Sequence, residues 1–582
     1  MEETIKIPWL KQVLFGVFAF SVIINILYLT GSLFMLQVYD RVIPSRNLPT
    51  LTGLLVLAAG LYIFQALLDV VRGRIFVRLA RSFDRAVSGA VFSALVMFPL
   101  VAPRMGDGLQ PIRDVATVRS FLAGGGPIIL FDLPWLPFFL AICFMFHFLI
   151  GLVATAGALI LLIIALASEL LTRGPVKEGA LFNSRQMGLA GAAHRNAEAL
   201  LSMGMMMSVR ERWLAANEEQ AALQARGADV VGGLGATSKA LRFLLQSAVL
   251  AVGAYLVINQ QATGGIIIAS SILTARALAP VELVIGQWKG ALAARDSWAR
   301  LKALMKAMPQ PGERLALPAP VATLDVEDLA VRAPGSAKTL ANGVRFKMRA
   351  GEAVGIIGPS GSGKSSLARA LAGVWAPAHG AVRLDGAPMH QWDRERLGAH
   401  VGYLPQDVEL FSGTIAENIG RLTIPVESAA VIQAARAAGV HEMILRFDAG
   451  YETQVGDQGA LLSKGQRQRI ALARALYKEP FLVILDEPNS NLDQEGDDAL
   501  ADAILGVKAR GGIVVVVAHR PNVINAVDHV LVMMDGRMQA FGPKDEVLKR
   551  VLSRAPLPRT APVNFQGPGS ESAGPQLGRP RP

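Results

Sequence analysis

The sequence contains a single cysteine, Cys143, among its 582 residues. One thiol cannot form an intrachain disulfide, and it has no second cysteine at the spacing of a metal site. Cys143 lies inside an apolar run, so we interpret it as a small packing residue. The chain also lacks a basic patch interleaved with aromatic residues, so its net charge of +11 does not indicate a nucleic-acid partner.

The first apolar run lacks the features of a cleavable signal peptide. It is too long, and the residues at its end, Gln37–Asp40, are not the small side chains of a cleavage site. Apolar residues make up 52% of the chain, and their long runs lie before about residue 290. Six runs approach the about 20 residues needed to cross a membrane: 13–37, 51–68, 128–146, 148–171, 243–259 and 264–287.

Positive charge is unevenly distributed between these runs. Lysine and arginine gather before the first run and in the two long connections that follow the second and fourth runs. The connection at 260–263 carries no charge, and 40–50 carries few. Cytoplasmic loops of membrane proteins carry such an excess of positive charge. We therefore expect both termini and the two long connections to be cytoplasmic.

The long connections have a helical pattern of their own. Within 75–87, an apolar residue recurs every four positions, as on one face of a helix. We therefore expect the spans to continue into the cytoplasm as helices. Each long connection then needs a short turn at its far end, and we place these turns near Asp107–Ala123 and Asn196–Trp213.

Composition divides the chain into two domains and a tail. The six runs assign residues 1–307 to an all-α transmembrane domain. A proline-rich linker at 308–320 separates it from a soluble α/β domain at 321–551. The last segment, 552–582, is rich in proline, glycine and serine, and we expect it to be disordered.

The string GPSGSGKSS begins at Gly358, after an apolar strand and before a helical pattern. In this context a P-loop cradles nucleotide phosphates with backbone N–H groups. We expect Lys364 to contact the β- and γ-phosphates and Ser365 to bind Mg²⁺; a glycine-rich turn with a chance lysine is the alternative. The predicted nucleotide contacts are Gly358, Pro359, Ser360, Gly361, Ser362, Gly363, Lys364, Ser365 and Ser366.

An apolar strand at 483–485 ends in two acids, Asp486 and Glu487. Sheets of α/β proteins place ligands at the carboxyl ends of their strands. We expect Asp486 to hold Mg²⁺ and Glu487 to orient or deprotonate an attacking water. A core strand that ends in two solvated acids is the alternative.

The string LSKGQ at 462–466 resembles the signature of the ATP-binding-cassette (ABC) ATPase family, which is usually Leu-Ser-Gly-Gly-Gln. The resemblance implies that this signature, with Ser463, Gly465 and Gln466, contacts ATP held by the P-loop of another subunit. Two chains are then required, and a homodimer is the simplest solution. The implied fold is a six-helix transmembrane exporter domain followed by an α/β P-loop ABC nucleotide-binding domain.

Three further positions match the family's motifs. The resemblance implies that Gln406, in GYLPQD, senses Mg²⁺ and the membrane domain, and that Asp493 belongs to the D-loop. It also implies that His519, after the strand 513–518, is the switch histidine at the γ-phosphate. A lone histidine after a strand is more often structural. This one, however, stands at the family's spacing from the other motifs, and that spacing supports the expectation.

Two positions depart from the family's pattern. Lys464 replaces a glycine of the signature, and we expect it to be tolerated because Ser463 and Gly465 remain. The aromatic residue that often stacks on adenine is missing upstream of the Pro-Gly pair at 334–335. Arg332 stands there instead, and it can stack on adenine through a cation–π contact.

Longer strings are similar to the ATPases of bacterial type I secretion systems, of the protease-exporter type. They are FDLPWLPFF (131–139), RALAPVELVIGQWK (276–289), the segment 383–419 and DEPNSNLD (486–493). The resemblance implies ATP-driven export of a polypeptide with an uncleaved C-terminal signal across the inner membrane. It also implies that this protein itself is embedded in the lipids of that membrane. The implied partners are a periplasmic adaptor, an outer-membrane channel and a secreted protein. No peptidase domain precedes the first span, so we do not expect cargo processing.

Two other functions share some of these features. An exporter of lipids or small amphiphilic molecules would carry every nucleotide motif and is the main alternative. A sensor that binds ATP without transport would be expected to have a damaged site, whereas here the motif residues are all present.

The sixth apolar run contains two charges, Arg276 and Glu282. Charges inside a span are costly and usually face a cavity or a partner. We expect Arg276 to line the translocation path. An ion pair, or a position near the cytoplasmic end of the span, is the alternative.

Overall fold

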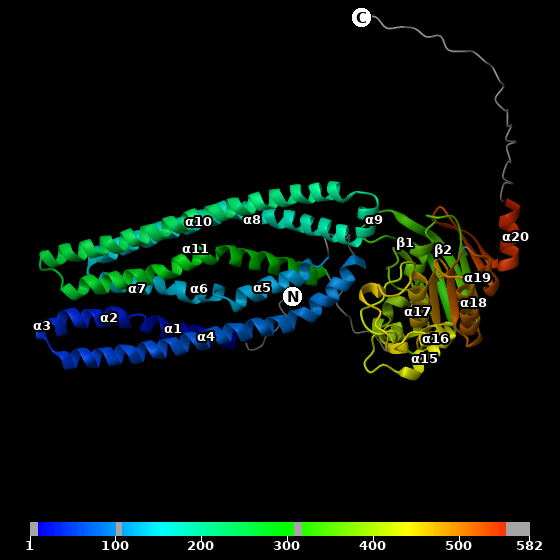
Figure 1. Cartoon of the computed structure of the whole chain (residues 1–582), viewed down its shortest axis with the longest axis horizontal. Helices are drawn as coiled ribbons and strands as arrows, with labels where there is room; N and C mark the ends of the chain where they lie inside the picture. Colours follow the sequence, from blue (N-terminus) through cyan, green and yellow to red (C-terminus); the bar gives the residue numbers. More distant parts are fainter. Residues whose placement is uncertain (1–9, 101–107, 308–316, 519, 555–582) are drawn as a thin grey trace, which may run out of the picture. The chain divides into compact units, whose positions relative to one another are not determined.

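The computed structural model describes residues 10–100, 108–307, 317–518 and 520–554. It divides into two compact units, Met1–Gln310 and Pro311–Pro582, which we call the membrane unit and the nucleotide unit. Figure 1 shows the first as a set of long helices and the second as an α/β fold. The division falls in the predicted linker, of which 308–316 lies outside the described residues, as does 555–582 of the predicted tail.

Six segments of the membrane unit are helical and are long and apolar enough to cross a membrane: Gln12–Ser45, Leu48–Leu100, Gly126–Phe146, Phe148–Arg195, Met206–Ile258 and Gly264–Ala307. Each overlaps one of the six predicted runs. The predicted six-helix class of this unit is therefore confirmed. The first span contains α1 (Leu10–Leu27), α2 (Thr30–Gln37) and α3 (Ile43–Ser45). The second, fourth, fifth and sixth spans each contain one long helix: α4 (Leu48–Met97), α8 (Phe148–Arg195), α10 (Met206–Ile258) and α11 (Gly264–Ala307).

Four of these helices are much longer than a membrane is thick. α4 has 50 residues, α8 has 48, α10 has 53 and α11 has 44, whereas about 20 residues cross the bilayer. The surplus agrees with the predicted helical extensions. The reversal between α8 and α10 contains the short α9 (Ala197–Ser202), inside the predicted interval.

The other predicted reversal, at 107–123, is wrong in its position. Most of that interval forms α5 (Gln110–Ala123), so the chain reverses before this helix. Val115 and Val118 of α5 are buried and pack in a cluster with Phe83 of α4 and Leu301 of α11. Burial of this apolar face favours a helix over a turn.

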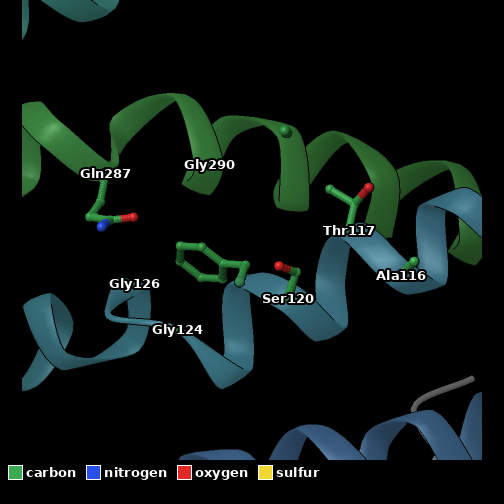
Figure 2. Close-up of a pocket in the computed structure, with 9 residues that line it drawn as sticks. Ala116, Thr117, Ser120, Gly124, Gly126, Gln287 and Gly290 are labelled. Atoms are coloured by element: carbon green, nitrogen blue, oxygen red, sulfur yellow. The ribbon is translucent and has the colours of Figure 1, made fainter.

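The third span follows α5 after a break at residues 124–125, and it consists of α6 (Gly126–Asp132), a 3₁₀ turn at Leu133–Trp135, and α7 (Leu136–Phe146). A Cβ at Gly126 would lie 2.1 Å from the ring of Phe121, so the backbone passes the ring more closely than another residue allows. Beside this break lies a cavity of about 450 Å³, which Ser120 of α5 and Gln287 of α11 both line (Figure 2).

Asp132, in the FDLPW string, lies in a buried polar network that joins three spans. Its Oδ1 accepts hydrogen bonds from Ser21 Oγ at 2.6 Å, Asn25 Nδ2 at 3.2 Å and Arg72 Nη1 at 2.8 Å. Nη2 of Arg72 pairs with Asp69 at 2.9 Å. Buried charges are tolerated when they are paired and hydrogen-bonded. The network therefore fixes α1, α4 and α6 to one another.

Two further contacts fix α11. Asp40 follows α2 in a π-helical turn, and its Oδ1 accepts a hydrogen bond from Gly265 N, at the start of α11, at 2.8 Å. Glu282 pairs with Arg242 of α10 at 2.8 Å. An ion pair, weighed as an alternative for the charges of this span, is therefore present, but it involves Glu282 and not Arg276.

The nucleotide unit is built on one sheet with the strand order β5-β4-β1-β2-β10-β9-β3-β8-β7-β6. The strands that carry the nucleotide motifs are parallel and sit side by side at one end of this order. The strands are β1 (Thr323–Arg332), β2 (Thr339–Arg349), β3 (Ala353–Ile357), β4 (His379–Leu384), β5 (Ala387–Pro388), β6 (Val401–Leu404), β7 (Leu482–Asp486), β8 (Ile513–Val517), β9 (His529–Met534) and β10 (Arg537–Pro543).

Helices cover both faces of the sheet. Alternate residues of β8 enter two separate apolar clusters, with Val514 and Val516 in one and Val515 and Val517 in the other. Strands buried on both faces read as continuous apolar runs, which is why β7 and β8 were visible in the sequence. The helices are α12 (Lys364–Leu371), α13 (Arg394–His400), α14 (Ile415–Ile419), α15 (Ser428–Ala437), α16 (His441–Leu445), α17 (Lys464–Leu476), α18 (Gln494–Ala509), α19 (Pro521–Ala526) and α20 (Lys544–Arg554), the last of which continues past the predicted domain end at 551.

Candidate nucleotide site

The P-loop connects β3 to α12 at the carboxyl end of a buried strand. Gly358, Gly361 and Gly363 have φ values of 150°, 81° and 95°, which only glycine adopts readily. A Cβ at Gly358 would lie 2.0 Å from the carbonyl oxygen of Met533, and one at Gly363 would lie 2.3 Å from that of Leu340. The neighbouring strands therefore fix the path of the loop and leave its tip, 359–361, exposed.

Lys364 begins α12 and is 4% exposed. Its Nζ donates hydrogen bonds to the carbonyl oxygens of Gly358 and Pro359, both at 2.9 Å. Burial lowers the pKa of Lys364, and the charges of Glu487 and Asp486 oppose this shift. The P-loop thus holds the ammonium group at the place predicted for a phosphate-binding cation.

The hydroxyl of Ser362, inside the same loop, is buried and has no hydrogen-bond partner within the described ranges. A buried donor without a partner costs free energy, so such groups usually have a role. A phosphate oxygen in the loop could accept a hydrogen bond from this hydroxyl. The loop's polar groups therefore fit a nucleotide phosphate.

Asp486 ends β7 and is completely buried. Its Oδ1 accepts a hydrogen bond from Ser365 Oγ at 2.9 Å, whereas Oδ2 has no partner among the residues that the structure describes. Burial raises the pKa of Asp486, and the hydrogen bond from Ser365 and the charge of Arg369 oppose the shift. A carboxylate oxygen and a hydroxyl are hard oxygen ligands of the kind that Mg²⁺ prefers. The residues present therefore fit the predicted ion.

Glu487 turns away from the end of β7 with a left-handed φ of 50°. Its backbone N–H donates to Val517 O at 3.2 Å, and its Oε2 accepts a hydrogen bond from Gln406 Nε2 at 2.9 Å. Gln406 follows β6, the strand beside β7. Two of the predicted catalytic residues are thus in direct contact at the carboxyl end of the sheet. The third, His519, lies outside the described residues.

The signature string forms the exposed start of α17. Ser463 Oγ accepts a hydrogen bond from Gln466 N at 3.2 Å, and Gln466 Oε1 accepts one from Ser463 N at 2.9 Å, which together make a capping box. A Cβ at Gly465 would lie 2.9 Å from Asn491 O, so the helix packs closely on the segment after Glu487. The side chain of Lys464 is exposed.

Our sequence analysis missed Gln468, which joins the signature helix to the end of β7. Its Nε2 donates hydrogen bonds to the carbonyl oxygens of Pro488 and of Glu487, the latter at 3.3 Å. Its Oε1 accepts a hydrogen bond from Asn491 Nδ2 at 3.0 Å. A signal was present in the sequence, because Gln468 lies one helical turn before Ala471 and Leu472 on the apolar face of α17. A polar side chain on a buried face indicates a specific partner.

The remaining predicted residues lie at the edges of the site. Asp493 caps α18, and its Oδ1 accepts a hydrogen bond from Gly496 N at 3.0 Å. Arg332 is the exposed last residue of β1. The contact of Asp493 with a nucleotide and the stacking of Arg332 on adenine stay predictions.

Comparison with known proteins supports the assignment of these motifs. Residues 341–490 match the family model of ABC transporters. The chain is 53% identical over 557 residues to the type I secretion system ATP-binding protein PrsD of Rhizobium meliloti (strain 1021), with 96% of each chain covered. It is 29% identical to the cyclolysin secretion/processing ATP-binding protein CyaB of Bordetella pertussis and 28% identical to the leukotoxin translocation ATP-binding protein LktB of Mannheimia haemolytica, with 91% of this chain and 75% of each relative covered.

A solved structure shares the fold. A bacterial Atm1-family ABC exporter with ATP bound aligns with a TM-score of 0.79 at 23% identity, covering 94% of this chain and 97% of the other. The predicted fold, a six-helix transmembrane domain followed by an ABC nucleotide-binding domain, is confirmed. The nucleotide unit is that of an ATPase that couples hydrolysis to transport. With more than half of its residues identical over nearly the whole length of such a relative, the chain belongs to the ATP-binding proteins of type I secretion systems, within the ABC transporters.

Proposed function

We propose that two copies of this chain use ATP hydrolysis to export a polypeptide with an uncleaved C-terminal signal across the inner membrane. The 53% identity to a type I secretion ATP-binding protein, over 96% of both chains, is the observation that carries this proposal. The similarity spans both units, so it includes the helices that would form the path. Two further relatives are named for the secretion of cyclolysin and the translocation of leukotoxin.

The P-loop would hold the phosphates of ATP. Lys364 would transfer its hydrogen bonds from the two loop carbonyls to the β- and γ-phosphates, and Ser362 would gain the partner that it lacks. Mg²⁺ would be held by Ser365, Asp486 and Gln406. Oδ2 of Asp486, which has no hydrogen-bond partner among the described residues, would then gain the ion as its partner. The ion would neutralise negative charge on the phosphates.

Glu487 would act as the general base that orients and deprotonates the attacking water. Its hydrogen bond with Gln406 at 2.9 Å supports this role, because it holds the carboxylate at the carboxyl end of β7, beside Asp486. Gln406 would then link the state of this carboxylate to the position of its own loop. His519 would contact the γ-phosphate from the end of β8.

A homodimer would complete each site. Ser463, Gly465 and Gln466 of one chain would contact the γ-phosphate held by the P-loop of the other, with Asp493 nearby. The capping box supports this arrangement, because Ser463 Oγ accepts its hydrogen bond and keeps its own proton to donate. The exposed N-terminus of the 13-residue α17 also favours a negatively charged ligand.

The proposed partners are a periplasmic adaptor and an outer-membrane channel, and secretion in cells tests the proposal. A bacterial strain without its own type I ATP-binding protein would receive this chain, its adaptor, its channel and a passenger protein. We expect the passenger in the medium only when it carries the C-terminal segment of a cargo encoded near this chain. Secretion that does not need the segment, or export of lipid in place of protein, would contradict the proposal.

A further inference from the structure

A second pocket of the membrane unit lies between α2, α4 and α11, where the chain bends between α1 and α2. It has a volume of about 390 Å³. Small or apolar side chains form most of its wall, but four polar side chains also line it: Tyr28, Tyr62, Gln65 and Arg276. A mostly apolar pocket with a few convergent polar groups is the usual form of a binding site.

Arg276 carries the charge of this pocket. Its guanidinium lies 4.6 Å from the centre of the Tyr28 ring, and within the described ranges no carboxylate pairs with it. Its side chain is exposed to the pocket. Arg242, on the neighbouring α10, instead pairs with Glu282 at 2.8 Å. A guanidinium has five N–H donors, and a cation–π contact satisfies none of them.

The depth of Arg276 argues against a lipid headgroup as the occupant. Arg276 is 12 positions beyond Gly264, where α11 begins. At about 1.5 Å per residue this places it ~18 Å along a span of ~30 Å, close to the middle of the bilayer. Phosphate groups of lipids lie at the surface of the bilayer, so an anion at this depth must belong to a molecule that crosses the membrane.

The pocket continues along one face of α4. Tyr62, Gln65, Asp69 and Arg72 are spaced by three or four residues, so they share a face of that helix. Arg72 and Asp69 are paired with each other, and Arg72 also pairs with Asp132. The charges at that end of the polar face are therefore compensated, whereas the charge of Arg276 is open to a ligand.

We propose that this pocket binds carboxylate side chains of the polypeptide in transit, with Arg276 as the group that recognises the anion. Tyr62 and Gln65 supply further hydrogen-bond donors from α4. The inference rests on the proposed export of a polypeptide and adds an affinity for acidic segments of the exported chain. One charged contact at a time suits a transport path, since each segment must also leave.

Binding of labelled peptides to the full-length protein in nanodiscs of uncharged lipid tests the inference. The probes are an extended peptide of alternating glutamate and glycine and its counterpart with glutamine in place of glutamate. We expect the glutamate peptide to bind about tenfold or more tightly, as for hydrogen bonds to a charged group. Arg276→Gln should remove this preference, and Arg276→Lys should retain part of it. Equal binding of the two peptides, or a preference that survives in Arg276→Gln, overturns the inference.

Two matched controls separate the pocket from general effects. Tyr62→Phe should weaken binding of the glutamate peptide, whereas Tyr255→Phe, on an exposed part of α10, should not. The melting temperature and the size-exclusion profile of Arg276→Gln should match those of the wild type, which shows that the variant is folded. Displacement of the glutamate peptide by phosphatidylglycerol in the nanodisc would assign the pocket to lipid and overturn the inference.

Secretion distinguishes the two levels of the proposal. If the wild-type chain secretes its passenger but shows no preference between the peptides, only the pocket assignment fails. If the chain secretes no polypeptide, the proposed function fails with it.

Discussion

The two units of this protein each bury an aspartate, and they treat its carboxylate differently. In the membrane unit, Asp132 accepts three hydrogen bonds, and the one from Arg72 is also an ion pair. In the nucleotide unit, Asp486 accepts one hydrogen bond from Ser365, and its Oδ2 has no partner within the described part of the chain. A saturated buried charge holds helices together, whereas an unsaturated one is costly unless a ligand completes it.

The arginines of the membrane unit show the same difference. Arg72 is 4% exposed and pairs with two aspartates. Arg276 instead faces a pocket and lies against the ring of Tyr28, and no carboxylate among the described residues pairs with it. The charge of Arg72 is thus paired within the protein, and we assign it to structure, whereas we assign the charge of Arg276 to a ligand.

The largest effect is expected at Glu487, beside the unsaturated Asp486. Glu487→Gln keeps the hydrogen-bonding shape of the side chain but removes its ability to take a proton. Loss of a general base lowers kcat by about 10²–10⁴-fold, and the ATP-bound dimer should accumulate. ATPase rates and size-exclusion chromatography with ATP measure both effects. Glu546→Gln, at an exposed site on α20, serves as the control. If Glu487→Gln hydrolyses ATP as fast as this control, the assigned role of Glu487 is rejected.

Asp132→Ala should have the next largest effect, but on stability. Removal of one partner from a buried ion pair leaves the other charge uncompensated and costs about 3–5 kcal/mol. We expect a lower yield of folded protein and a lower melting temperature of the membrane unit, with the double variant Arg72→Met, Asp132→Leu recovering part of the loss. Asp229→Ala, at an exposed site on α10, is the control. Unchanged stability in Asp132→Ala would show that the network is not structural.

Gln468→Ala should affect catalysis while leaving ATP binding in place. The side chain holds the carbonyl oxygens of Glu487 and Pro488, so its loss should displace the base. The about 1–3 kcal/mol of a buried hydrogen bond corresponds to a fall in kcat of roughly tenfold. KM for ATP should stay near its wild-type value, because Gln468 does not contact the P-loop. An equal loss in the exposed Gln494→Ala, or a change confined to KM, would argue against a positioning role.

Asp486→Asn should give the smallest change in stability, in the opposite direction to Asp132→Ala. Burial raises the pKa of Asp486, so ionisation is less favourable in the folded state than in the unfolded state. The contribution of Asp486 to the free energy of unfolding is therefore complete below the ordinary pKa of an aspartate. It is lost as the pH rises through the raised pKa of the folded state. Without nucleotide, the variant should melt a few degrees higher at neutral pH, at about 2–4 °C for each kcal/mol.

Stabilisation by Mg²⁺ with ATP should decrease in the same Asp486→Asn variant. Melting curves across pH, with and without Mg²⁺ and ATP, measure the two effects together. A nucleotide-free variant that is less stable than the wild type at neutral pH would show that the carboxylate of Asp486 is structural, like that of Asp132.

Much of the fold was predictable because its signals are local. The membrane spans and the strands β7 and β8 are long apolar runs, and the P-loop and signature are contiguous strings. The error at 107–123 arose because the pattern located an apolar helix but not its end: α4 ends at Met97, and most of the interval forms a helix of its own. Prediction of the turn required knowledge of what Val115 and Val118 pack against, and that depends on α4 and α11.

The parts of the sites that were not predictable depend on residues far apart in the sequence. Glu282 was recognised as a charge inside the sixth apolar run, but its partner Arg242 is 40 residues away on another helix. Asp132 stands 60 residues from Arg72 and 111 from Ser21. Such pairs leave no spacing signal. Gln468 differs, because its place on the apolar face of α17 could have been noticed from the sequence.

Transport into inside-out membrane vesicles tests the central claim most directly. Vesicles that contain this chain would be mixed with a labelled cargo polypeptide, with or without ATP, and the label protected from added protease would be measured. We expect protection only with ATP, with the C-terminal segment of the cargo present, and with the wild-type chain but not Glu487→Gln. ATP hydrolysis that moves a labelled phospholipid across the bilayer and leaves the polypeptide outside would contradict the account.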